Sequence, residues 1–457
     1  MQKSLYLKDV FEKILFIYVF LIPFTVSSIV SDTGLLLLMT VLTFFIGTIV
    51  LINNRKKIYL GRIVIYTFFI PLLLALLIGS TTAMLFSPLG INYWELPEVM
   101  IGRLLNYLFV FIIFQATLLL YQNKTNFDKD LFFLKYIKAY WLGCFILLFI
   151  GFWQVLSWST GIPFPFEGMR THVHSVDAAM RALIGGRMTS ITNEPSFLAP
   201  FIIDFALISM LLFVKRKMYF FVGMALLGVF YTFSGGGYMN VGMIIFAATC
   251  VLFVKSILKR NKTMFVCFLS MILIMIALFV FFVLPGIENS PLMIVFSRGD
   301  AILDTESHSR AAFIFKPFIL MQESTWLNML FGHGPKSYEL IGTRFNFAGE
   351  PFHVTSNNLF TDIFWEHGMV GLLGLIVLFT YFLRNSISIF KENSKEEWVL
   401  FMFTIHLFAS SLYRADFASG RFYTLLIIFI FLIYRKKEKW KNKSDEKIQI
   451  LPLERKV

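Results

Sequence analysis

Long apolar blocks alternate with short polar segments along nearly the whole chain. A helix needs about 20 mainly apolar residues to cross a bilayer, and twelve blocks reach or approach that length. The pairs within 219–254 and 399–434 are the shortest, so each pair either includes neighbouring polar residues or forms a re-entrant hairpin. We predict spans at residues 14–30, 35–52, 63–86, 101–121, 139–158, 197–214, 219–233, 240–254, 264–285, 358–383, 399–413 and 422–434.

The composition also indicates a membrane protein. Of the 457 residues, 57% are hydrophobic and only 15% are charged, which is too apolar for a soluble chain of this length. The three cysteines lie in apolar blocks without metal-binding spacing, so they indicate neither a disulfide nor a zinc site. No small-residue cleavage site follows the first apolar block, which we therefore expect to be a retained span. The expected fold class is an all-α polytopic membrane protein, with residues 1–457 forming a single integral membrane domain.

The distribution of Lys and Arg predicts that both termini are cytoplasmic, because cytoplasmic segments are enriched in these residues. With that orientation, the inner segments hold 30 of the 41 Lys and Arg residues. The net charge of +13 then reflects topology and attraction to lipid headgroups, and no nucleic-acid partner is expected. Residues 435–457 form a basic cytoplasmic tail, and residues 286–357 form one large extracytoplasmic loop.

Eleven cations remain on the outer side, and nine of them are Arg. Arg binds phosphate and carboxylate groups through two parallel hydrogen bonds, which Lys cannot do, so these residues suggest an anion site. The alternative is that Arg lies at the membrane interface because its long stem reaches the polar headgroups. The eleven are Arg103, Arg170, Arg181, Arg187, Arg298, Arg310, Lys316, Lys336, Arg344, Arg414 and Arg421.

Polar motifs gather in four of the outer segments. Arg187 and residues 193–196 precede the span at 197–214, where helix capping by Asn193 or Glu194 is the structural alternative. The glycines of residues 234–238 permit close approach of a ligand, although a hairpin turn needs the same residues. The remaining two motifs contain Ser309, Arg310, Gly332, His333, Gly334, Pro335, Lys336, His353, Ser356, Asn357, Asn358, Asp362, Glu366 and His367. Isolated histidines, His406 among them, are interpreted as structural.

Together these features resemble the O-antigen polymerase and O-antigen ligase superfamily. The resemblance covers residues 185–374 in motif and the whole chain in topology. The shared features are twelve spans, a large loop before the tenth span, Arg187 with Asn-Glu-Pro-Ser, a Ser-Gly-Gly-Gly turn, Ser309-Arg310, Gly-His-Gly-Pro, and Ser-Asn-Asn-Leu followed by Glu366-His-Gly.

The resemblance implies a GT-C-like glycosyltransferase of the bacterial cytoplasmic membrane, acting at its outer face. Such an enzyme moves a glycan from undecaprenyl pyrophosphate onto an acceptor hydroxyl without a metal ion or other cofactor. The implied partners are the lipid-linked oligosaccharide, the bilayer, and flippase and chain-length regulator proteins. Arg187 and Arg310 correspond to family residues that hold the pyrophosphate. The further substrate-binding positions are Asn193, Ser196, Gly236, Lys336, Asn357 and Asn358.

Two positions depart from the family pattern. The family's Ser-Arg-Gly turn is Ser234-Gly235-Gly236 in this chain, and its His-Asn pair falls on Asn357-Asn358. The nearest imidazole is His353, which lies one helical turn before Asn357 if that segment is helical. We therefore interpret His353 as the general base, with Glu194 as the alternative base or as a partner of Arg187.

Three activities remain open at this stage. Asn-Glu-Pro-Ser favours a polymerase that joins lipid-linked repeat units into a surface polysaccharide such as O-antigen or capsule. The related alternative is a ligase that transfers the finished glycan to a lipid or protein acceptor. A flippase or exporter is the alternative from another class, and it predicts charges along a path through the membrane. Asp204 is the chief charge inside a long span, and the other charges cluster on one face, which favours a transferase.

Cysteine labelling of intact cells tests the orientation. A cysteine at Asn289 is expected to react with a membrane-impermeant maleimide, because residues 286–357 are predicted to lie outside. A cysteine at Asn393 is expected to react only after permeabilisation, since residues 384–398 are predicted to lie inside. Labelling at 393 but not at 289 in intact cells would reverse the topology.

Overall fold

The computed structural model describes residues 2–31, 33–54, 58–167, 186–258, 266, 269–270, 310–340, 356–390, 394–417 and 419–450. Seven helical segments within these residues are long and apolar enough to cross a membrane. They are Leu35–Ile52, Arg62–Phe86, Met100–Gln122, Asn126–Thr160, Pro195–Leu212, Gly235–Leu258 and Leu359–Phe390. Each coincides with a span expected from the sequence, so the all-α membrane class is confirmed. The full set of twelve spans stays a prediction.

The other predicted spans have less regular counterparts. The first block is divided between α1 (Gln2–Leu21) and a short 3-10 turn, Ile22–Val26, that begins before Pro23. The block at 264–285 lies outside the described residues except at 266 and 269–270. The remaining three blocks coincide with α11 (Arg216–Thr232), α19 (Lys395–Ser411) and α20 (Gly420–Ile450).

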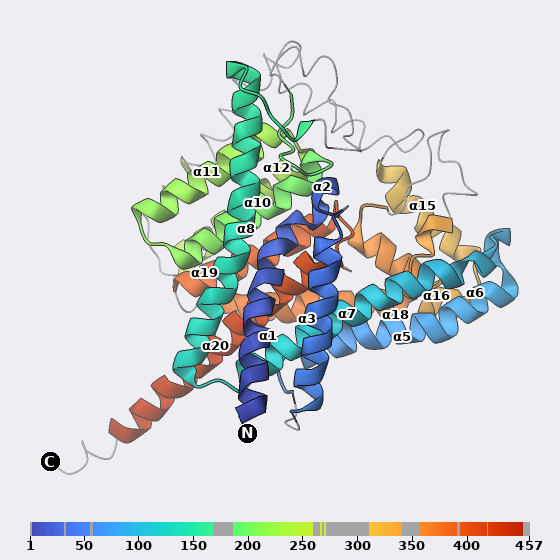
Figure 1. The fold of residues 1–457 in the computed structure, drawn as a ribbon, viewed down its shortest axis with the longest axis horizontal. Coiled ribbons are helices and arrows are strands. Elements are labelled where there is room, and N and C mark those ends of the chain that lie inside the picture. The colour runs from blue at the N-terminus through green and yellow to red at the C-terminus, as the bar shows by residue number, and fades with distance from the viewer. Residues whose placement is uncertain are drawn as a thin grey trace.

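The described helices pack in three neighbouring groups (Figure 1). In the first, α1 packs against α3 (Leu35–Ile52) and α8 (Asn126–Thr160). In the second, α10 (Pro195–Leu212) packs against α8, α11, α12 (Gly235–Leu258) and α19. The third contains α18 (Leu359–Ser386) and the segment 62–86, with α15 (Arg310–Gln322) and α16 (Trp326–Phe331) against α18. Helix α7 (Leu96–Gln122) packs against α3 and α20. Helix α1 begins and α20 ends on the same side of the molecule in this view.

Segment 62–86 is not a regular α-helix. Helices α4 (Arg62–Val64), α5 (Ile70–Leu74) and α6 (Ser80–Phe86) are joined by two π-helical turns, Ile65–Phe69 and Ala75–Gly79. Such turns are often found at functional sites. Both turns pack against α18, so this segment shapes the surroundings of that helix.

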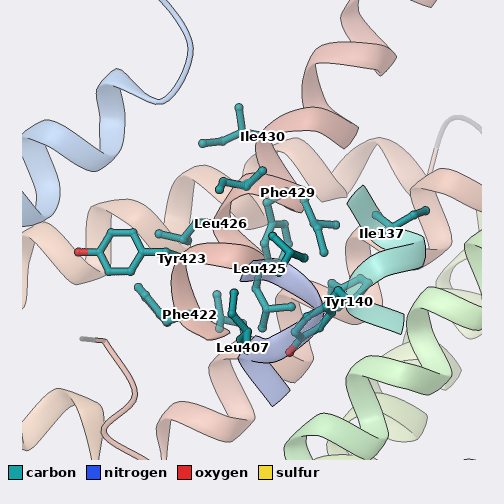
Figure 2. Packing of buried hydrophobic residues seen from close by; sticks show 14 of the residues in the cluster. Ile137, Tyr140, Leu407, Phe422, Tyr423, Leu425, Leu426, Phe429 and Ile430 are labelled. Atoms are coloured by element: carbon teal, nitrogen blue, oxygen red, sulfur yellow. The ribbon is translucent and has the colours of Figure 1, made fainter. Parts of the chain in front are cut away.

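Helix α20 fills the centre of the apolar core with its first half. Figure 2 shows Ile137 and Tyr140 of α8 and Leu407 of α19 around residues 422–430 of α20. Beyond Tyr434 the helix becomes charged, and Arg435 pairs with Asp130 of α8 at 3.0 Å. The apolar half is therefore held inside the bundle, while the charged half anchors the end at which α8 begins.

Gly79, at the end of the second π-helical turn, allows an unusually close backbone contact with the loop after α16. A Cβ at residue 79 would overlap the carbonyl oxygen of Gly332. The side-chain amide of Asn328 links the two backbone segments by donating to the carbonyls of Gly79 and Gly332, both at 2.9 Å. The loop therefore sits directly on segment 62–86.

We expect Gly79→Ala to lower the stability of the purified protein by about 1–3 kcal/mol, because the added methyl forces the two backbones apart. The measurement is the apparent melting temperature in detergent. Gly102→Ala is the matched control, since it is also a helical glycine and a Cβ there meets nothing within 4 Å. Equal melting temperatures for the two variants would contradict the close packing of Gly79 on the loop.

Candidate functional site

A buried ion pair inside the bundle joins two helices that are far apart in the sequence. Arg421 of α20 donates from Nε to Asp204 Oδ2 at 2.8 Å and from Nη2 to Oδ1 at 3.2 Å. Both side chains are almost fully buried, Asp204 at 0% and Arg421 at 1% exposure. A charge held away from water is tolerated only with such pairing. Asp204, the isolated charge of the sequence, is therefore matched by a cation 217 residues away.

Further polar groups complete this cluster. Tyr140 donates its hydroxyl to Asp204 Oδ2 at 2.8 Å, and His406 Nε2 lies 2.8 Å from Oδ1. On the other side of its ring, His406 Nδ1 lies 3.0 Å from the side-chain oxygen of Asn240. These contacts agree with the interpretation of His406 as a hydrogen-bonded structural residue. Helices α8, α10, α12, α19 and α20 each contribute to the cluster.

The same arginine fixes the loop between α19 and α20, residues 412–417. Its Nη1 donates to Asp416 at 3.1 Å, and Asp416 in turn pairs with Arg414 at 2.8 Å. The Arg414 guanidinium lies 4.4 Å from the ring centre of Phe197, in the first turn of α10. Nη1 of Arg414 is buried and has no hydrogen-bond partner among the described residues. The 412–417 loop thus brings a partly unsatisfied guanidinium to the start of α10.

The predicted residues 193–196 form this start. Glu194 is the N-cap residue and Pro195 opens α10, as the sequence suggested, but the Glu194 side chain caps no backbone amide. Instead it accepts a hydrogen bond from the Ser196 hydroxyl at 2.7 Å. The backbone N–H of Asn193 donates to the carbonyl of Val26. The side-chain oxygen of Asn193 is buried without a hydrogen-bond partner among the described residues. The Glu194 carboxylate therefore does not serve as a helix cap.

Arg187 holds the backbone before α12, and Gly236 in the first turn of α12 lies beside the 412–417 loop. Arg187 donates from Nη2 to the Phe233 carbonyl at 2.9 Å and from Nε to the Thr232 carbonyl at 3.3 Å. The turn predicted at residues 234–238 is not formed by the glycines. The bend falls at Phe233, with φ 46°, and the three glycines begin α12. A Cβ at Gly236 would lie 2.6 Å from the Tyr413 ring, so the glycine lets α12 approach the 412–417 loop.

Asn358 ties the start of α18 to the same loop. Its side-chain oxygen accepts from the amides of Phe360 and Thr361 at 3.0 and 3.1 Å, and its Nδ2 donates to the Leu412 carbonyl at 3.0 Å. Asn357 has a φ of 57°, so residues directly before α18 are not helical. The assumption that His353 and Asn357 share one helical face is therefore wrong at Asn357. His353 itself lies outside the described residues.

A second polar cluster lies farther along α18. Glu366 is 1% exposed, and Arg103 Nη2 of α7 lies 3.8 Å from its Oε1. His367 Nε2 lies 3.9 Å from Glu366 Oε2. The Arg103 guanidinium also lies over the rings of Tyr107 and Phe417, at 5.7 and 5.5 Å. Since Phe417 belongs to the 412–417 loop, whose Asp416 pairs with Arg421, that loop contacts both clusters.

The Gly-His-Gly-Pro motif holds this part of α18 in place. The N–H of His333 donates to the Trp365 carbonyl at 2.9 Å, and the N–H of Gly334 donates to the Glu366 carbonyl at 3.1 Å. The His333 ring is stacked between Tyr93 and Trp365. Burial lowers the pKa of His333 to about 3, so this imidazole stays neutral at physiological pH and serves packing.

The structure places most of the predicted residues around the start of α10 and the 412–417 loop, which we call the site end of the bundle. Asn193, Glu194 and Ser196 line the start of α10, and Arg187, Gly236 and Asn358 support the loop and its neighbours. Lys336 lies apart, paired with Glu339 at 2.8 Å. Arg310 is the first residue of α15, but its side chain lies outside the described part of the chain.

Sequence reasoning did not select Arg103, Arg414 or Arg421 from the eleven outer cations, although all three were among them. It named Glu366 and His367 within a motif but assigned them no role. The signal available for Asp204 was its position as a lone charge in a span, which predicts a partner without naming it.

The fold and the two buried polar clusters define a polytopic helical membrane protein with its candidate site at one end of the bundle. Models of known protein families and curated protein sequences give no match to the chain.

Asp204→Asn is expected to destabilise the protein by about 3–5 kcal/mol, because it leaves the buried Arg421 charge without its partner. The double variant Asp204→Asn, Arg421→Met should lose less than the sum of its single variants. Melting in detergent measures both effects. Asp130→Asn is the control, since its ion pair with Arg435 has the Asp130 side chain 57% exposed and should contribute little. Additive losses in the double variant would rule out the coupling.

Proposed function

We propose that the protein is a polymerase that joins undecaprenyl-pyrophosphate-linked oligosaccharide repeat units into a surface polysaccharide. In this proposal it is a GT-C-like glycosyltransferase in the bacterial cytoplasmic membrane, working at the outer face. The observation that carries the proposal is the convergence of motif residues from separate parts of the sequence at one end of the bundle. Asn358 and Gly236 contact the 412–417 loop directly, at Leu412 and Tyr413. Arg187 holds the backbone just before Gly236, and Glu194 opens α10, whose Phe197 lies against Arg414 of that loop.

The charges at the site end suit the chemistry of this reaction. When the glycan leaves its carrier, negative charge develops on the pyrophosphate, and guanidinium groups in a partly dry site stabilise that charge. Arg414 supports the proposal because it lies beside α10 with one buried nitrogen unsatisfied among the described residues. Arg187 supports it differently, by bracing the Thr232 and Phe233 carbonyls next to the same place.

A small, partly open pocket lies between α7, α18, α20, segment 62–86 and Phe417 of the 412–417 loop. Its wall is almost entirely aromatic and aliphatic. Ligand sites of this kind bind an apolar body and orient it with a few polar groups.

Deleting the gene is expected to leave single repeat units on the carrier lipid, whereas loss of a ligase would leave full-length chains there. Expression of the wild-type protein should restore long chains. Arg187→Lys and Arg310→Lys keep the charge but lose the two-pronged hydrogen bonding, so polymer yield should fall about 10- to 100-fold. Gel analysis of surface polysaccharide measures the chain length.

Lys135→Arg is the control, because this cation lies in a predicted inner segment and should leave chain length unchanged. Normal polymer in both Arg→Lys variants, at equal membrane levels, would place the pyrophosphate site elsewhere. Full-length glycan on the carrier lipid in the deletion strain would replace the polymerase by the ligase.

A further inference from the structure

Helix α18 is interrupted directly after Glu366 and His367. Gly368 has φ 66° and ψ −163°, a conformation that residues with side chains rarely adopt. The break lets the loop after α16 approach closely, since a Cβ at Gly368 would overlap Leu330 and Gly332. A broken helix within a membrane bundle commonly marks a binding site, because its freed backbone and side chains face a cavity.

Two buried polar atoms lie at this break without hydrogen-bond partners among the described residues. They are Oε2 of Glu366 and Nε2 of His367, and both side chains are more than nine-tenths buried. Leaving such groups unsatisfied costs about 1–3 kcal/mol each, so each needs a partner that the described residues do not supply. Nε of Arg103 is a third such atom in the same cluster.

The spacing of the first two atoms specifies the kind of partner. Their separation of 3.9 Å is too long for a direct hydrogen bond. One oxygen atom about 2.8 Å from each of them would bridge the gap with ordinary hydrogen-bond lengths. A hydroxyl group fits this position, since it donates to the carboxylate and accepts from the imidazole N–H at the same time.

The surroundings of the gap suit a hydroxyl carried on a larger molecule. His367 lines the aromatic pocket together with Tyr107, Phe417 and Tyr423, so its ring is reached from that pocket. Arg103 lies 3.8 Å from the other Glu366 oxygen and provides a compensating charge. The pocket thus offers apolar ring faces and the His367 imidazole, and the Glu366 carboxylate lies 3.9 Å from that imidazole. Ring faces with one donor and one acceptor suit a sugar better than an ion or a pure hydrocarbon.

We propose that Glu366 and His367 bind the acceptor sugar hydroxyl and that Glu366 is the proton acceptor of the reaction; this rests on the polymerase function proposed above. The hydroxyl oxygen attacks the anomeric carbon of the donor glycan and forms the new glycosidic bond. The bond between that carbon and the pyrophosphate oxygen breaks, and the pyrophosphate leaves with the electron pair. The hydroxyl proton passes to Glu366 Oε2, while His367 holds the hydroxyl in position.

The test is Glu366→Gln in the purified full-length protein, assayed with the lipid-linked repeat unit extracted from a deletion strain. Gln keeps the shape but cannot take the proton, so kcat should fall at least about 100-fold, the usual minimum contribution of a general base. KM for the lipid-linked unit should change little, because the pyrophosphate is held elsewhere. A purely structural residue would not separate kcat from KM in this way.

Glu397→Gln is the matched control. Glu397 is also a buried carboxylate, at 3% exposure, and it lies 3.8 Å from a cation, Lys436, at the opposite end of α19 from the site. This variant should retain the wild-type kcat. Glu366→Asp provides a second test if Glu366→Gln melts at a much lower temperature. It keeps the charge beside Arg103 but draws the carboxylate back by about 1.5 Å, one carbon–carbon bond, and should also lose kcat.

The outcomes separate the two proposals. Polymer from the wild type at an unchanged kcat in Glu366→Gln, or in a well-folded Glu366→Asp, overturns the role of Glu366 and leaves the polymerase intact. No polymer from the folded wild type overturns the polymerase itself. Loss of kcat in both Glu366 variants, with normal activity in Glu397→Gln, supports the assignment.

Discussion

The paired hydrogen bonds between Arg421 and Asp204 are the interaction on which the rest of the site depends. A guanidinium and a carboxylate buried in an apolar bundle are each costly alone, so the pair forces α10 and α20 into one relative position. The same guanidinium extends to Asp416, which fixes the 412–417 loop. Residues of α10, α12, α18 and α7 then contact that loop or its neighbours.

This arrangement divides the polar interior into two parts with different properties. Around Asp204, every interaction is made within the protein, through Arg421, His406 and Tyr140. Around Glu366 and Arg103, the charges are near each other but several atoms lack partners among the described residues. A satisfied cluster gives rigidity, whereas an incompletely satisfied one is suited to receive a ligand. The rigid part supports the receptive part through the loop that contacts both.

The sequence was sufficient for the features that depend on local pattern. Apolar length predicted the seven helices that are long and apolar enough to cross a membrane, and Pro195 after Glu194 located the start of α10. It was insufficient where distant segments meet. Nothing local to Asp204 identifies Arg421 as its partner, and the turn glycines gave no sign that Tyr413 would pack on Gly236. The break at Gly368 was also missed, because a glycine in an apolar block is compatible with an unbroken helix.

Helix α20 has a mechanical consequence of its own. It runs for 31 residues, about 46 Å at the usual rise. Arg421 in the buried ion pair and Arg435, which pairs with Asp130, are about 21 Å apart along it. A continuous helix resists compression along its axis, so movement at one end is passed to the other with little loss. The basic residues after Tyr434 and the site end are therefore connected by one continuous helix. A shift of α20 along its axis would therefore move Arg421, the residue that holds the 412–417 loop.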